Sequence, residues 1–188
     1  MKKLAIALAL AALTTSAFAA PDTYDIDPAH TAPRFEYSHF GYSMQIHSFD
    51  KTSGKIVYDP AAKTGSVDIT IDAKSVNTGY ALLNEHIQGE DFFDTAKYPT
   101  ITFKSTSVKF KGDKPVEVMG NLTVKGITKP VTLTLTSFQA KPHPMMKKDA
   151  IGANAVTKIK RSEFNMGKYA PNVSDDVTLS IAVEAVKE

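Results

Sequence analysis

Residues 90–105 read Glu-Asp-Phe-Phe-Asp-Thr-Ala-Lys-Tyr-Pro-Thr-Ile-Thr-Phe-Lys-Ser, and this stretch marks where the chain changes from helix to strand. The segment before it, 80–88, has helical character. Pro99 disfavours helical backbone at the residue before it, so the chain enters extended structure there. Beyond the proline, Ile101 and Phe103 share one face of an extended chain. The stretch therefore predicts a short helix that lies against a β-structure as a lid or plug.

Alternation of apolar and polar residues with a period of two dominates the rest of the chain. One example is Val131-Thr132-Leu133-Thr134-Leu135. Such alternation is typical of a strand with one buried face, and strands of this kind belong to antiparallel sheets. We predict strands near 34–39, 45–49, 55–58, 66–73, 100–105, 116–125, 131–136, 153–160 and 177–185.

Turn-forming sequences around Gly112 and Gly126 separate consecutive strands by short links. Short links favour an antiparallel meander, and a meander of about eight strands that closes into a barrel leaves no exposed edge. We therefore predict an all-β fold, an eight-stranded antiparallel barrel with one short helix. A barrel of this size is just wide enough to hold one small ligand.

The first 19 residues have the features of a secretory signal peptide. Lys2 and Lys3 precede an apolar run over 4–13, and Ala17-Phe18-Ala19 fits the small-x-small cleavage pattern. The apolar run is too short for a membrane-spanning helix, and no second run reaches the ~18 residues that a span needs. We expect residues 20–188 to form a single soluble domain that is exported to a bacterial periplasm.

The mature chain would carry no net charge. The sequence has 22 basic and 20 acidic residues, and removal of the two signal-peptide lysines leaves them equal in number. The positive field that attracts nucleic acid is therefore missing. The chain also contains no cysteine, which excludes disulfides and thiol chemistry.

Motifs for catalysis or metal binding are missing from the sequence. It has no Gly-x-Ser-x-Gly elbow, no phosphate loop and no His-Glu-x-x-His pair. His39 and His47 flank a turn and could approach each other, but a zinc site needs three or four convergent ligands and no acidic motif completes the set. We expect neither an enzyme nor a metal or cofactor site.

Seven segments carry a resemblance that spans nearly the whole mature chain. They are Asp27-Pro28-Ala29-His30, His39-Phe40-Gly41, 71–78, Asp91-Phe92-Phe93-Asp94, 98–105, 120–131 and 160–166. Together and in this order they resemble the YceI family, a lipocalin-like group of exported bacterial proteins. The resemblance implies an extended barrel of lipocalin-like topology with a long hydrophobic tunnel that takes isoprenoid or other long-chain amphiphiles.

The sequence departs from the pattern of that family at a few positions. His47 stands where a glycine is common, and Thr52 where an aromatic is common. Leu83 and Asn84 replace a charged pair near the helix, and Gln88 replaces a basic residue. If those charges meet a ligand head group in the family, a pyrophosphate head is less expected here.

A lipid tunnel would be lined by large apolar side chains. Each methylene removed from water is worth about 0.8 kcal/mol, so a tail of tens of carbons needs an apolar sheath with polar groups only near its mouth. The tunnel-lining candidates are Phe35, Tyr37, Phe40, Tyr42, Met44, Ile46, Phe92, Phe93, Phe103, Met119 and Phe164. For each of them ordinary core packing is the alternative.

We expect the chain to bind a long-chain amphiphile, first of all an isoprenoid lipid, and to carry or store it without covalent chemistry. The alternative is a non-enzymatic structural or stress-response interaction module with a filled barrel. A homodimer is compatible with both. Scattered basic residues usually face solvent, but an anionic head group could be attracted by Lys147, Lys148, Lys158, Lys160 and Arg161.

Overall fold

The computed structural model describes residues 20–188, and the expected signal peptide lies outside the described residues. The described chain has one α-helix, α1 (Ala81–Gln88), and two short 3-10 helices, η1 (Ala73–Ser75) and η2 (Arg161–Phe164). Its strands are β1 (Asp22–Ile26), β2 (Ala32–His39), β3 (Ser43–Phe49), β4 (Thr52–Asp59), β5 (Thr64–Asp72), β6 (Val76–Asn77), β7 (Thr100–Lys111), β8 (Lys114–Val124), β9 (Ile127–Pro142), β10 (Asp149–Lys160) and β11 (Asp176–Lys187).

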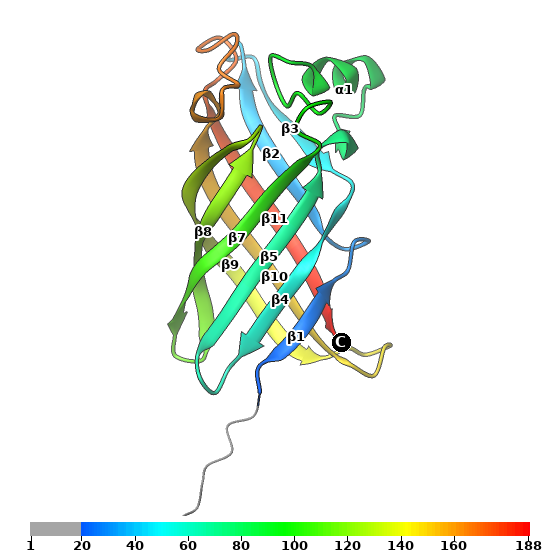
Figure 1. Cartoon of the computed structure of the whole chain (residues 1–188), viewed down its shortest axis with the longest axis vertical. Coiled ribbons are helices and arrows are strands. Elements are labelled where there is room, and N and C mark those ends of the chain that lie inside the picture. The colour runs from blue at the N-terminus through cyan, green and yellow to red at the C-terminus, as the bar shows by residue number, and fades with distance from the viewer. Residues whose placement is uncertain (1–19) are drawn as a thin grey trace, which may run out of the picture.

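The strands form one antiparallel sheet that closes on itself (Figure 1). One edge of β11 pairs with β10, while its other edge pairs with β1 near Ala185 and with β2 near Leu179. β1 and β2 are thus two halves of one bent strand. β3 pairs with β2 and β4 pairs with β1, so β3 and β4 are likewise two halves of one bent strand. β6 pairs with β3 and β5 pairs with β4, so β5 and β6 form a third bent strand. The result is a meander of eight strands, and the predicted eight-stranded barrel with one short helix is confirmed.

Side-chain alternation explains why these segments become barrel strands. In β9 the side chains of Val131, Leu133 and Leu135 are half-buried, and the threonines between them are exposed. Gly120 of β8 leaves room for the Phe103 ring of the neighbouring strand β7, because a Cβ atom there would lie 2.5 Å from that ring. The apolar face of each strand therefore points into the barrel, as the period of two requires.

The buried side chains gather in two clusters along the barrel. The larger cluster lies toward α1 and includes Phe49, Ile87, Phe103 and Phe164. The smaller cluster includes Tyr24, Tyr58, Ile151 and Ala185.

Residues 90–105 form the predicted junction between helix and sheet. α1 lies across one end of the barrel, and the chain then turns through 89–99 before β7 begins at Thr100 (Figure 1). The Pro99 carbonyl oxygen accepts a hydrogen bond from the Ala73 amide at 2.9 Å, which holds the turn against η1. The helix predicted over 80–88 is confirmed as α1.

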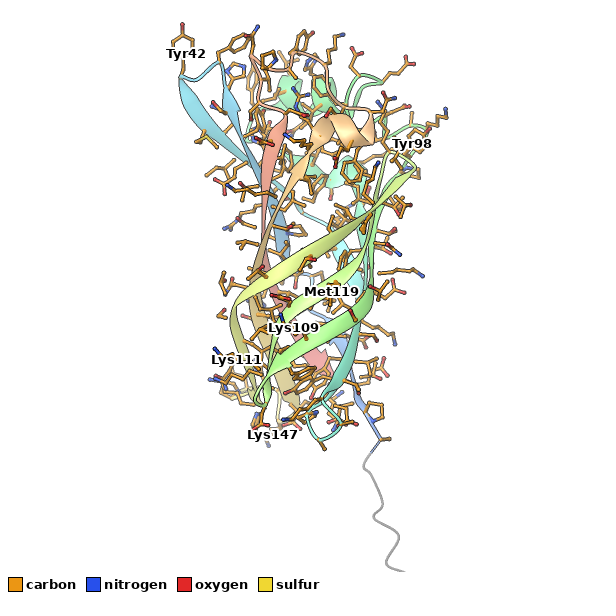
Figure 2. All side chains as sticks on the ribbon, turned by 90° about the vertical axis from the view of Figure 1, so that its left-hand side faces the viewer. Tyr42, Tyr98, Lys109, Lys111, Met119 and Lys147 are labelled. Atoms are coloured by element: carbon orange, nitrogen blue, oxygen red, sulfur yellow. The ribbon has the colours of Figure 1, made fainter. Side chains whose placement is uncertain are left out.

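The two ends of the barrel differ in the side chains that they present. Tyr42 and Tyr98 lie at the end that carries α1, and Lys111 and Lys147 lie at the opposite end (Figure 2). We refer to these as the α1 end and the lysine end. Within residues 20–188, α1 is too short to cross a membrane, and no other helix is long and apolar enough to do so.

Candidate ligand cavity

An apolar cavity of about 450 Å³ runs inside the barrel. Its lining reaches from Phe110 and Pro115 near the lysine end to His86 and Tyr169 at the α1 end. Inward-facing valines, leucines and isoleucines from most of the strands form the walls between these ends. The volume falls in the ~300–1,000 Å³ range of small-molecule sites. The barrel therefore encloses space that its own side chains do not fill. The alternative of an interaction module assumed a filled barrel.

Three aromatic rings line the cavity at the lysine end. The Tyr58 ring stacks on Phe110 at 6.3 Å between centroids and packs at a tilt against Phe138 at 5.3 Å. The Tyr58 hydroxyl donates to the Asp113 carbonyl oxygen at 3.4 Å, and burial raises the pKa of this phenol. These contacts form an apolar floor with one anchored polar atom.

The mouth of the cavity lies at the α1 end. Phe40 and Tyr169 both line the cavity and are about half exposed, at 52% and 50%. Both have a left-handed backbone, which is uncommon for a bulky residue. Phe92 packs between the His86 ring at 5.1 Å and the Tyr169 ring at 6.2 Å. Aromatic side chains from three separate segments therefore frame the opening.

Phe93 anchors the segment after α1 to the barrel wall. Its ring meets Phe35 at 5.8 Å and Phe49 at 5.4 Å, both in edge-to-face geometry. Aromatic pairs of this kind are worth ~0.5–1.5 kcal/mol beyond the area that they bury. Phe92 and Phe93 point to different partners because adjacent side chains diverge, so one frames the mouth and the other fixes its flank.

Six of the eleven tunnel-lining candidates border the cavity and five do not. The six are Phe35, Tyr37, Phe40, Phe92, Phe93 and Phe103. Tyr42, Met44 and Ile46 are exposed on the β2–β3 hairpin, at 91%, 56% and 60%. Met119 lies on the outer face of β8, where it alternates with the buried Val118 and Gly120, and Phe164 is fully buried in the core beside η2.

The polar groups near the cavity are few and are mostly held in the neutral state. The Tyr37 hydroxyl and the His47 Nε2 atom are 3.1 Å apart and form a hydrogen bond. Burial raises the pKa of Tyr37 and lowers the pKa of His47, so both remain uncharged near neutral pH. Thr52 also borders the cavity, and its buried hydroxyl has no hydrogen-bond partner among the described residues.

Arg161 is the buried cation at the cavity wall. Its guanidinium group donates to the carbonyl oxygens of Ser174 at 2.8 Å, Val173 at 2.7 Å and Met166. Burial lowers its pKa from the ordinary value for arginine. Its donors are directed at the backbone of 166–174, so Arg161 shapes the loop that carries Tyr169.

The other basic residues considered for a head group are not gathered at the mouth. Lys160 is exposed and pairs with Asp176 at 2.8 Å, and Lys158 is also exposed. Lys147 and the adjacent Lys148 lie in the loop at the lysine end (Figure 2). Of this set, only Arg161 borders the cavity.

The histidines do not converge with one another. The His39 ring packs on Phe40 at 4.6 Å, while the buried His47 contacts Phe35 and Tyr37. His30 instead lies beside Asp27, with 2.7 Å between Nδ1 and Oδ2, and Glu184 is close to both. This group could not be recognised from the sequence, because Glu184 comes from the far end of the chain.

Comparisons with known proteins place the chain in a family. A family model for the YceI-like domain matches residues 24–185. Protein YceI of Escherichia coli O157:H7 is 38% identical over 194 residues, which span the whole of both chains. The chain belongs to the YceI family. Protein YceI of Salmonella arizonae is 36% identical over 192 residues, again across both full chains.

Solved structures of YceI-like barrels share the fold. BcnA of Burkholderia cenocepacia superposes with a TM-score of 0.71 at 29% identity and covers 85% of this chain and 99% of its own. The YceI protein of Campylobacter jejuni gives 0.69 at 32% identity, with 80% and 90% covered. A polyisoprenoid-binding domain from Saccharophagus degradans gives 0.67 at 19% identity, with 88% and 98% covered, a likeness of fold.

Several cavity residues of this YceI-like domain could not be identified from sequence alone. Tyr58, Phe110 and Phe138 come from three strands and meet only in the folded barrel. Tyr169 lies in an irregular loop with no periodic pattern. Arg161 lay within a segment resembling the family, which was the available signal, but its burial was not expected.

Proposed function

We propose that this YceI-family protein binds one long-chain amphiphile inside the barrel, first of all an isoprenoid lipid, and carries or stores it. The observation that carries the proposal is the apolar cavity, which is lined by an aromatic cluster at the lysine end and has its mouth at the α1 end. Each methylene taken out of water contributes about 0.8 kcal/mol, so the tail supplies the binding energy. The description of the Saccharophagus degradans domain as polyisoprenoid-binding supports the same ligand class.

The polar groups near the cavity favour a ligand whose polar part is uncharged. Tyr37 and His47 are neutral and bonded to each other, and three of the five Arg161 N–H donors are directed at backbone carbonyl oxygens. The buried Thr52 hydroxyl has no hydrogen-bond partner among the described residues, and it presents no charge to a ligand. An alcohol or carbonyl compound therefore fits these walls better than a pyrophosphate.

The same polar groups are consistent with a protein that sequesters its ligand without covalent chemistry. In the part of the chain that the structure describes, no serine or threonine hydroxyl is hydrogen-bonded to a histidine, as a nucleophile and its base would be. The Asp27–His30 pair lies outside the cavity lining. We therefore propose a carrier or store with no cofactor.

We also propose that residues 1–19 direct export and are then removed, so that the protein works in the periplasm. The charged start, apolar run and small-residue cleavage site support this. N-terminal sequencing of protein recovered from the periplasmic fraction tests it. A chain that begins at residue 20, or one residue to either side, is expected, and an intact Met1 there would contradict the proposal.

The binding proposal is tested by filling the cavity from one strand. Ala155 is buried and lines the cavity, whereas Val156, the next residue of β10, points outward. A fluorescent long-chain polyene is titrated into the wild type, Ala155→Trp and Val156→Trp, with polyprenol as competitor. We expect one site per chain, at least about tenfold weaker binding in Ala155→Trp, and wild-type binding in Val156→Trp. Equal affinity in all three proteins would place the ligand elsewhere and overturn the proposal.

A further inference from the structure

Exposed large apolar side chains are concentrated at the α1 end. Seven of the ten such side chains in residues 20–188 lie on the β2–β3 hairpin, on or next to α1, or in the loop that carries Tyr169. Tyr42 stands at the tip of the hairpin, 91% exposed, and projects from the end of the molecule (Figure 2). Contiguous exposed apolar surface marks an interaction site more often than single apolar residues do.

The β3 strand presents two of its three apolar side chains, Met44 and Ile46, to the outside of the barrel, while Phe49 is buried in the core. Met44 and Ile46 are exposed at 56% and 60%, while His47, on the opposite face, is buried at 4%. β9, by contrast, follows the usual rule of apolar side chains inward and polar side chains outward. A strand that reverses this rule has lost apolar burial, which is expected where function requires the exposed face.

The charge pattern of this end indicates what could cover it. Residues 37–49 contain no aspartate, glutamate, lysine or arginine, so this outer part of the hairpin can leave water without burying one of these charges. The neighbouring segment 80–98 carries four acidic residues and one lysine, which would repel an anionic surface. The patch is therefore complementary to an uncharged or zwitterionic surface.

We propose that the β2–β3 hairpin and the adjoining α1 rim dock the open end of the barrel on the surface of a zwitterionic lipid bilayer. Tyrosine side chains such as Tyr42 favour the boundary between lipid and water. The outer edge of β3 pairs with β6 only at Ser48 and Phe49, so the edge before Ser48 has unpaired backbone groups that confine the hairpin to the interfacial layer. The patch is continuous with the cavity mouth through Phe40 and Tyr169, so a lipid passes between bilayer and cavity without crossing water.

The passage of ligand rests on the proposed function, but the docking itself does not. Another copy of the chain could cover the same patch, and this is one of the outcomes of the test. Self-association would appear in sedimentation without vesicles.

Flotation with phosphatidylcholine vesicles tests the docking. Tyr42→Ser combined with Ile46→Ser removes two apolar side chains that do not line the cavity. Met145→Ser combined with Met146→Ser is the matched control, since these residues are also exposed, at 86% and 53%, but lie in the loop at the lysine end. Circular dichroism and urea unfolding establish that both variants are folded.

We expect the wild type and the control to float with the vesicles and the hairpin variant to bind about tenfold more weakly. Addition of phosphatidylglycerol should not strengthen binding, and salt should have little effect. Absence of wild-type flotation, or equal flotation of both variants, would overturn the docking proposal. A wild-type dimer that the hairpin variant abolishes, without flotation, would assign the patch to a second copy and also overturn it.

The same proteins are titrated with the polyene probe in the absence of vesicles. We expect the hairpin variant to retain wild-type probe affinity, because its cavity is unchanged. Loss of probe binding in the wild type would count against the proposed function alone, whereas loss of flotation with probe binding intact would count against the docking alone.

Discussion

The lysine end and the α1 end of the barrel use aromatic side chains in opposite ways. At the lysine end, Tyr58, Phe110 and Phe138 pack on one another inside the barrel, and the surrounding turns carry ion pairs such as Lys63 with Asp113 at 3.4 Å. At the α1 end, Phe40 and Tyr169 on the rim are about half exposed, and Tyr42 projects into solvent.

This difference separates the parts of the fold that close the cavity from those that open it. The lysine end follows the usual arrangement of apolar groups inside and charges outside, which needs only stability as an explanation. The α1 end departs from that arrangement in β3, where the exposed Ile46 precedes the buried His47. Departures of this kind are expected at functional sites, so the α1 end is where binding and exchange should be sought.

The largest effect on stability is expected from the core phenylalanine Phe164, which lies beneath the α1 end. Phe164 is fully buried, so Phe164→Ala should lower the free energy of unfolding by about 3–5 kcal/mol. Phe40→Ala, at the exposed rim of the same end, should change it by less than ~1 kcal/mol. Urea unfolding of both variants measures the contrast, and similar losses would show that the rim is part of the core.

An intermediate effect is expected from opening the lysine end. Phe138 is half-buried against Tyr58, so Phe138→Ala should cost roughly 1–3 kcal/mol, less than a fully buried phenylalanine. It should also create a second exit, which would increase the dissociation rate of a bound polyene probe severalfold in stopped-flow displacement. An unchanged dissociation rate together with lowered stability would mean that Phe138 contributes to packing but does not close the cavity.

A smaller effect is expected from pH. Burial lowers the pKa of His47, so the unfolded chain takes up a proton more readily and the stabilising contribution is lost as pH falls below about 6.5. The hydrogen bond to Asp27 raises the pKa of His30 in the folded protein. The stabilisation that this pair gives to the folded state is therefore complete below about pH 6.5 and is lost as the pH rises through the folded pKa.

Urea midpoints at pH 5 and pH 7.5 distinguish the two histidines. His47→Gln should reduce the loss of stability on acidification, and His30→Gln should change the pH dependence in the opposite direction. If both variants kept the pH dependence of the wild type, neither histidine would have the environment described for it.

The smallest effect is expected from the ion pair across the mouth. Asp91 and Lys168 pair on the surface and connect the segment after α1 to the loop that carries Tyr169. Exposed pairs contribute ~0–1 kcal/mol, so Asp91→Asn should lower stability by no more than this, and less at high salt. A loss above ~2 kcal/mol in thermal unfolding would show that the mouth is held by charge and not by Phe92 and Phe93.

Much of the barrel could be predicted from sequence because alternation specifies which face of a strand is buried. The helix at 80–88 and the start of β7 after Pro99 were also readable, since they depend on local backbone preferences. β1 was not predicted, because its five residues become a strand only by pairing with β4 and with the distant β11. Such pairing depends on the closure of the whole barrel.

The cavity lining was only partly predictable, for two physical reasons. Met119 lies among the polar residues of its own strand pattern, so the alternation of β8 already placed it outside. Met44 and Ile46 alternate as an inward face would, and only the folded barrel shows that this face points outward. Phe164 is as apolar as a lining residue, and sequence does not distinguish a filled core from a cavity wall.

The central claim is that the cavity holds one long-chain lipid, and native mass spectrometry of protein purified from its own host tests it most directly. We predict a mass increase of one lipid per chain, which organic extraction identifies as an isoprenoid compound and which the Ala155→Trp variant lacks. Repeated preparations in which the wild type has only the mass of its polypeptide chain would contradict this account.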